Sequence, residues 1–188
     1  MQATPSELTT PRTSSPETLR DAFRDLHGPR LHGFALLATL GDRALAARLS
    51  AEALTTGAAR ADDLRHPERA AAWLRAHVVR SLPRRLRTPS PAERRAGLEP
   101  MGIDAAVVVG LAVLGVHERA ALVASDVERL DRHDVETIVG RRGGGLDRLL
   151  ARARRDYAAA YADVPDVSPG AGGPIESQVA TVAARTMR

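Results

Sequence analysis

The stretch VETIVGRRGGGLDRLLARAR, residues 135–154, constrains the fold of this chain most strongly. Apolar residues recur at helical spacing from Val135 to Val139, and Gly140 interrupts the pattern. Two arginines and three further glycines follow, and a second amphipathic period starts at Leu146. Two helical periods on either side of a glycine-rich break predict a helix, a tight turn and a second helix. The pattern is typical of a helix-turn-helix motif.

A phosphate-binding loop is an alternative interpretation of the same glycines. Such loops follow a strand and carry a GxxxxGK[ST] or GxGxxG pattern. The chain contains no Lys, and its glycines are spaced GxxGGG from Gly140 to Gly145. The segment before them starts at Asp131 with a helical start signal rather than a strand. The sequence therefore favours the helix-turn-helix interpretation.

The second helix of this motif has a predicted basic face. Arg148, Arg152 and Arg155 are spaced by four and three residues, which places them on one side of a helix. Arg141 and Arg142 lie in the turn before it. The second helix of a helix-turn-helix enters the major groove, and Arg suits phosphate and guanine edges, so these five residues are the predicted DNA contacts. The alternative is that they form the solvated face of an amphipathic helix.

The rest of the chain also predicts helices. Ala, Leu and Arg dominate, whereas β-branched and aromatic residues are sparse. A Ser-Pro-Glu start signal at residues 15–17 opens the first helix, and Gly28-Pro29 is expected to end it. A second stripe, from Leu31, is expected to stop at Gly41. Further helix starts are predicted at Asp42, His66-Pro67, Asp104 and Asp131.

The predicted fold class is all-α: two small helical bundles joined by a linker, the second a helix-turn-helix bundle. The boundaries are a disordered N-terminus at 1–15, a first bundle at 16–82, a linker at 83–102, a helix-turn-helix bundle at 103–162 and a flexible tail at 163–188. Pro and Arg are frequent in the linker, which lacks an apolar period. No apolar run reaches the roughly 20 residues that span a bilayer, and no signal pattern is present, so a cytoplasmic protein is expected.

No enzymatic chemistry is expected. The chain has no Cys, and its six His residues lack the close spacing of a zinc motif. The carboxylates of Asp62-Asp63 and of Asp163 and Asp166 lie in predicted loops or in the tail. We predict no metal, no cofactor and no catalytic residue. The net charge of +4 permits a nucleic-acid partner without demanding one.

The order of these elements resembles the extracytoplasmic-function group of RNA polymerase sigma factors. The resemblance covers residues 17 to about 160 and runs without gaps over residues 115–157. The matching positions are His117–Val123, Asp126–Glu128, Leu130, Gly140, Gly144 and Arg152–Arg154. In the first half, residues 29–54 and the helix around Trp73-Leu74 are similar to the family pattern.

The resemblance implies a function without chemistry of its own. The first bundle of such proteins binds the clamp of RNA polymerase and helps to open the minus-ten element. The second bundle recognises the minus-thirty-five element. The resemblance places the polymerase contact at Arg48, Leu49 and Glu52, and it implies core RNA polymerase and promoter DNA as partners, with an anti-sigma factor as a further one.

The chain departs from the family pattern at positions that the resemblance places at or near the polymerase and DNA contacts. Arg48 stands where the family has an acid, Asp147 where it has Lys, and Arg142 where it has a capping Ser. Glu136 replaces a small buried residue, and a carboxylate is hard to bury unpaired. Two hypotheses follow: a divergent sigma-factor-like transcription protein, or a degenerate module that binds a regulator without directing transcription.

Overall fold

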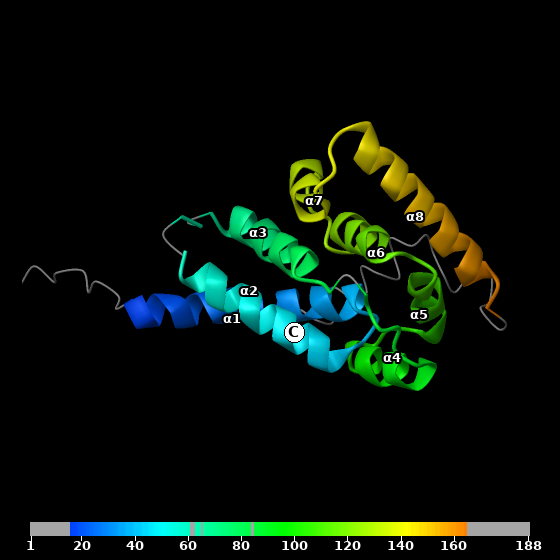
Figure 1. Cartoon of the computed structure of the whole chain (residues 1–188), viewed down its shortest axis with the longest axis horizontal. Coiled ribbons are helices and arrows are strands. Elements are labelled where there is room, and N and C mark those ends of the chain that lie inside the picture. Colours follow the sequence, from blue (N-terminus) through cyan, green and yellow to red (C-terminus); the bar gives the residue numbers. More distant parts are fainter. Residues whose placement is uncertain (1–15, 61–62, 65, 84, 165–188) are drawn as a thin grey trace, which may run out of the picture.

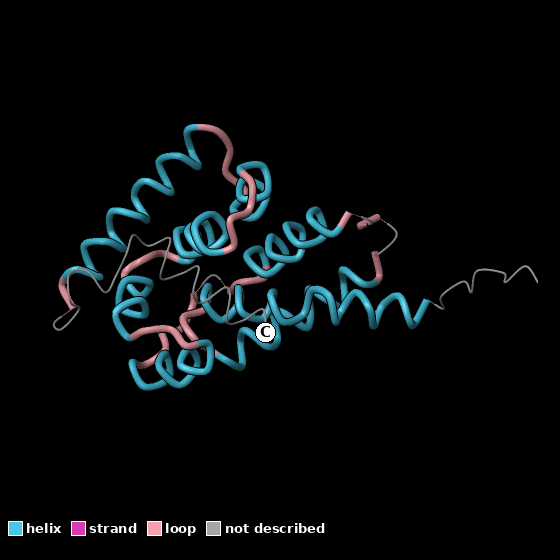
Figure 2. Tube along the Cα trace, turned by 180° about the vertical axis from the view of Figure 1, so that it is seen from behind, coloured by secondary structure: helices cyan, strands magenta, loops and turns pink. Residues whose placement is uncertain are grey.

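A computed structural model describes residues 16–60, 63–64, 66–83 and 85–164, and helices connected by loops make up this part of the chain (Figures 1 and 2). The elements are α1 Pro16–Ala38, α2 Arg43–Ala58, α3 Pro67–Arg80, α4 Pro91–Leu98, the 3₁₀ helix η1 Glu99–Met101, α5 Ala105–Ala112, α6 Val116–Leu122, the π-helical turn η2 Val123–Val127, α7 Arg132–Val139 and α8 Gly144–Ala162. The predicted all-α class is confirmed for the described residues, and the arrangement of two bundles with a linker is not contradicted. The predicted disordered N-terminus lies outside the described residues, as do Asp62 and the tail from residue 165. No helix in the described ranges combines the length and the apolar content needed to cross a bilayer.

Helix α1 is longer than the sequence analysis predicts. Gly28-Pro29 was expected to end a helix, but α1 continues through Pro29 to Ala38. Proline inside a helix costs about 3 kcal/mol because it lacks an N–H donor and its ring crowds the preceding turn. Leu31 and Phe34, immediately after it, are almost fully buried. Burial of these two side chains requires α1 to continue as one helix, and it offsets the free-energy cost of the proline.

The other helix starts are where the sequence predicts them. The Asp42 carboxylate accepts a hydrogen bond from the Leu45 amide at 3.0 Å, and Asp131 accepts one from the Asp134 amide at 2.9 Å. Pro67 occupies the first turn of α3, where its missing N–H costs nothing. Asp104 precedes α5 without a side-chain capping bond. Side-chain caps and proline therefore account for three of these four starts.

The linker contains a helix that the sequence analysis did not predict. Ser90 and Glu93 form a capping box: the Glu93 amide donates to Ser90 Oγ at 3.2 Å, and the Ser90 amide donates to Glu93 Oε2 at 2.7 Å. Leu98, at the end of α4, is fully buried. The S-x-x-E signature was present in the sequence, but a single buried apolar residue gives no period to detect.

Two glycines seat α4 against the corner between α1 and α2. A Cβ atom on Gly97 would lie 2.0 Å from the Gly41 carbonyl oxygen, and one on Gly41 would lie 2.8 Å from the Arg94 carbonyl oxygen. Gly41 also has a φ of +79°, which L side chains rarely adopt. The two backbones are therefore in contact at a distance that only glycine permits.

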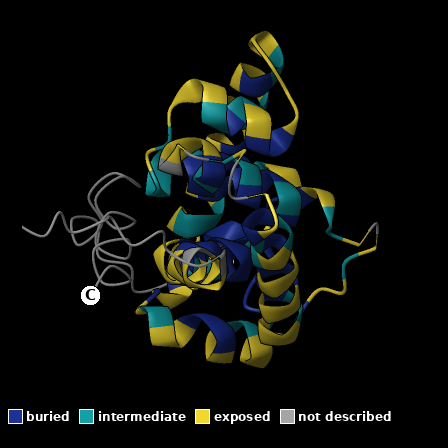
Figure 3. Cartoon of the chain, turned by 90° about the vertical axis from the view of Figure 1, so that its left-hand side faces the viewer, coloured by how far each residue is buried: buried dark blue, intermediate teal, exposed yellow. Residues whose placement is uncertain are grey.

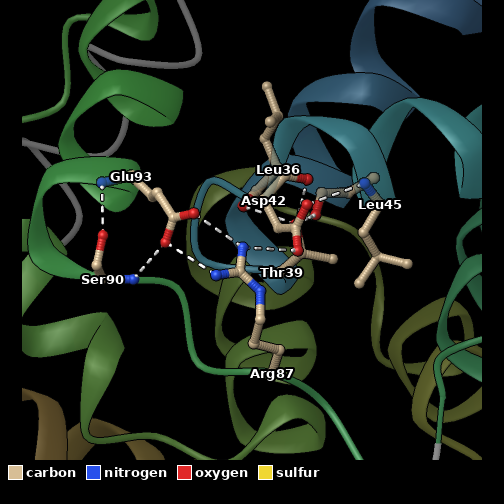
Figure 4. A network of polar contacts seen from close by, with 8 residues as sticks. Leu36, Thr39, Asp42, Leu45, Arg87, Ser90 and Glu93 are labelled. Carbon is tan, nitrogen blue, oxygen red and sulfur yellow. Dashed lines mark hydrogen bonds and ion pairs between the residues drawn. The ribbon is translucent and has the colours of Figure 1, made fainter.

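An arginine from the linker reinforces this seat (Figure 4). Arg87 donates two hydrogen bonds of 3.0 Å to the Glu93 carboxylate and lies 3.9 Å from the carboxylate of Asp42. Asp42 caps α2, so the same arginine connects the linker to the start of that helix. We call the group of Asp42, Arg87, Ser90 and Glu93 the linker latch.

The two bundles share one hydrophobic core. α1 packs against α6, and α3 packs against α7, so helices of the first bundle contact helices of the second. Figure 3 shows the buried surfaces of the helices turned toward one another and the exposed surfaces turned outward. The core runs from Leu31 and Leu74 in the first bundle to Val123 and Ile138 in the second. The bundles are thus joined by packing as well as by the linker.

A mostly buried ion pair crosses the junction between the bundles. The guanidinium of Arg75, on α3, binds both carboxylate oxygens of Glu128, which follows η2, with the Nη2–Oε1 distance at 2.6 Å. Their side chains are 5% and 16% exposed. Arg75 also donates to the Ala71 carbonyl at 3.0 Å and lies over the ring of Phe34. A bidentate pair in this position fixes how α3 meets the second bundle.

Candidate nucleic-acid interface

The glycine-rich stretch forms a sharp corner between α7 and α8 (Figure 2). Gly140 ends α7 with φ of +66°, and Gly143 precedes α8 with φ of +53°. A Cβ at either position would meet nothing within 4 Å, so conformation rather than crowding requires glycine there. The corner is the helix-turn-helix predicted from the sequence, and no strand enters it.

A polar clamp holds this corner. Arg132, in the first turn of α7, donates to both carboxylate oxygens of Asp147 at 2.7 and 3.0 Å. The same guanidinium donates to the Gly143 carbonyl at 3.1 Å, and the Gly143 amide donates to Glu136 Oε1 at 2.9 Å. Arg132 lies 3.4 Å from Glu136 as well. We call these four residues the corner clamp.

The clamp gives two departures from the family pattern a structural role. The hydrogen bond from Arg132 lowers the pKa of Asp147 below its ordinary value, so this carboxylate is ionised and paired. Glu136 is only 16% exposed, but it is hydrogen-bonded rather than left unpaired. Both acids therefore stabilise the turn, and Arg132 offsets the negative charge that Asp147 would otherwise present to a phosphate.

Three of the five predicted DNA contacts form an unpaired basic group. Arg141, Arg142 and Arg148 are exposed, and no carboxylate within the described part of the chain forms an ion pair with them. Arg141 and Arg142 lie in the turn, and Arg148 lies in the second turn of α8. We call these three residues the free basic group. Its charge is at the N-terminal end of α8, where a helix already favours an anion.

The other two predicted contacts are engaged within the fold. Arg152 lies 3.2 Å from Glu118 on α6 and 3.5 Å from Asp156. Arg155 lies 3.2 Å from the same Asp156. Both remain exposed enough to meet solvent, but a phosphate would compete with carboxylates for them. The predicted basic face thus divides into a free N-terminal half and a paired C-terminal half.

The three residues of the predicted polymerase contact differ in their exposure. Arg48 and Glu52 are exposed on α2, with 3.9 Å between Nη1 and Oε2. Leu49, by contrast, is fully buried in the core. It lies on the face of α2 that packs inward, and an apolar side chain at helical spacing more often serves the core than a partner.

Sequence reasoning missed Arg132 as a site residue. It precedes Asp147 by 15 positions, and no helical spacing connects them. Only the sharp corner brings the start of α7 beside the start of α8. A basic residue next to the capping Asp131 was the one signal available, and by itself it does not indicate a partner.

Helix α7, the glycine corner and α8 thus form a helix, a tight turn and a second helix within an all-α fold. No family model, curated protein or solved structure matches this chain.

Proposed function

We propose that this protein is a sigma-factor-like transcription protein that binds duplex DNA through the start of α8 and core RNA polymerase through α2. The free basic group carries this proposal. Arg141, Arg142 and Arg148 lie around a helix-turn-helix corner and form no ion pair with a carboxylate of the described ranges. The N-terminus of α8 adds its own attraction for phosphate there. The resemblance to the extracytoplasmic-function group supplies the partner classes, promoter DNA and polymerase.

The pairing of the arginines refines which of them bind DNA. A guanidinium that already holds a carboxylate must give up that pair before it gains a phosphate. Arg148 therefore contributes more than Arg152, which lies close to Glu118 and Asp156. Binding is expected to be strongest at the N-terminal half of α8, as in a recognition helix.

A salt titration of duplex binding tests this proposal. The logarithm of the binding constant falls with the logarithm of salt by about 0.9 for each phosphate that the protein neutralises. Arg142→Ala and Arg148→Ala are each expected to weaken binding and to reduce this slope by about 1. Arg152→Ala is expected to change affinity and slope less, because Arg152 already pairs with Glu118 and Asp156.

Arg24→Ala is the matched control. Arg24 is an exposed arginine on α1, 3.6 Å from Asp21 and far along the chain from the corner. Its replacement is expected to leave both affinity and slope unchanged. Equal slopes for all four variants and the wild type would exclude the free basic group as the DNA contact.

The second candidate function is a degenerate module that binds a regulator without directing transcription. The closed junction between the bundles favours it. α3 packs on α7, and the buried Arg75–Glu128 pair holds them together, so the surface of α3 that faces the junction is covered. The positions of Arg48 and Asp147 add to this argument, because each reverses the charge of the family pattern.

In vitro transcription with core polymerase separates the two candidates. Promoter-specific transcripts are expected if the protein directs initiation, and Arg148→Ala should reduce them. Copurification of core polymerase with the protein from its own cells is the second measurement. Absence of both, with retained binding of a regulator, would support the module instead.

A further inference from the structure

Two arginines outside the candidate interface have buried N–H groups without acceptors among the described residues. Arg119, on α6, is 8% exposed, and its Nε and Nη1 atoms make no hydrogen bond within this part of the chain. The Nε atom of Arg94, on α4, is buried and likewise has no partner there. Arg75, which is buried too, contrasts with them because it is held by a carboxylate.

The surroundings of this pair are short of negative charge. No carboxylate in the described ranges forms an ion pair with Arg94 or Arg119. Burial and, to a lesser extent, the nearby charge of Arg94 together lower the pKa of Arg119 to about 10. Arg119 is therefore still a cation at neutral pH, and the charge of Arg94 repels it.

A pair of this kind is costly unless something neutralises it. Removing a cation from water without a counter-charge costs several kcal/mol, and buried N–H groups are nearly always hydrogen-bonded. Replacing the arginines by apolar residues would avoid that cost. An anionic partner that accepts from both guanidiniums would instead compensate it, because a guanidinium fork suits an oxyanion.

We propose that Arg94 and Arg119 form a binding site for a phosphate-type oxyanion between α4 and α6. Both helices pack on α1, so the ligand would join the linker helix to the helix-turn-helix bundle. The depth of Arg119 favours a small free anion over the backbone phosphate of a duplex. This site is separate from the free basic group, and it does not depend on the proposed transcription function.

Calorimetric titration with inorganic phosphate, in chloride buffers of matched ionic strength, tests the site. The wild-type protein is expected to bind phosphate saturably and to unfold at a higher temperature when phosphate is present. Arg94→Gln is expected to weaken phosphate binding about tenfold or more, the loss typical of one charge-assisted hydrogen bond. Arg95→Gln, at the adjacent exposed position of α4, is the control and should behave as the wild type.

Arg119→Met gives an independent readout. In phosphate-free buffer this variant should be at least as stable as the wild type, because it removes an unpaired buried cation, and it should show no response to phosphate. A wild type without a phosphate response, or an equal response in every variant, would overturn the proposal. The same titration with a short DNA duplex is the second measurement. Binding of the duplex without binding of inorganic phosphate, lost in Arg94→Gln, would overturn the free-anion site and show that these arginines bind a DNA phosphate.

Discussion

At Gly97 the backbone of α4 leaves no room for a methyl group. The nearest atom to a Cβ there is a backbone oxygen of Gly41, which cannot rotate away as the end of a side chain can. Two glycines at this seat allow Leu98 to reach the core. A local feature of two residues therefore decides whether the linker is docked or free.

Gly97→Ala is expected to destabilise the protein by roughly 1–3 kcal/mol or more, because the added carbon must displace α4 from the corner between α1 and α2. Urea denaturation followed by circular dichroism measures the change. Gly145→Ala is the matched control: Gly145 lies in α8, and a Cβ there would meet nothing within 4 Å. Alanine at that position should be neutral or stabilising by up to about 1 kcal/mol. Similar losses for both variants would contradict the close contact at Gly97.

Among the elements, the segment 85–103 gains its structure from several weak local features. The capping box starts α4, the two glycines seat it, and the linker latch connects it to the start of α2. The hydrogen bonds from Arg87 and Ser90 lower the pKa of Glu93 to about 2, compared with about 4.5 for an ordinary Glu. The ionisation of Glu93 therefore sets the pH range over which the linker latch contributes to stability.

The latch is expected to weaken in acid. Because the pKa of Glu93 is lowered by folding, its contribution is complete above pH 4.5 and is lost as the pH falls toward about 2. The difference in unfolding free energy between the wild type and Glu93→Gln should therefore shrink over that interval. Chemical denaturation at a series of pH values measures it. Glu99→Gln, on the same segment, controls for the loss of a negative charge, and an identical pH profile for the two variants would exclude the latch.

At the scale of the whole molecule, the junction between the bundles decides whether the chain behaves as one unit or two. The shared core and the Arg75–Glu128 pair indicate one cooperative unit. Loss of a single partner would leave a buried charge without compensation, which is more damaging than removal of both.

Arg75→Met is expected to destabilise the protein by roughly 3–5 kcal/mol, and Glu128→Leu by a similar amount. The double variant Arg75→Met with Glu128→Leu should be more stable than either single variant, since no buried charge remains. A double-mutant cycle from urea denaturation measures this coupling. Additive losses would show that the two side chains act independently of one another.

The sequence by itself determined the all-α class, most helix starts and the helix-turn-helix corner, because caps, glycines and apolar periods act over a few neighbouring residues. It placed the five DNA-contact candidates on the right elements, but it could not separate Arg148 from Arg152, since the partners of Arg152 include Glu118 on another helix. The tertiary structure alone decided that α1 continues through Pro29 and that Arg132 meets Asp147. These outcomes depend on contacts between distant segments, whose energies outweigh local preference only once the chain has packed.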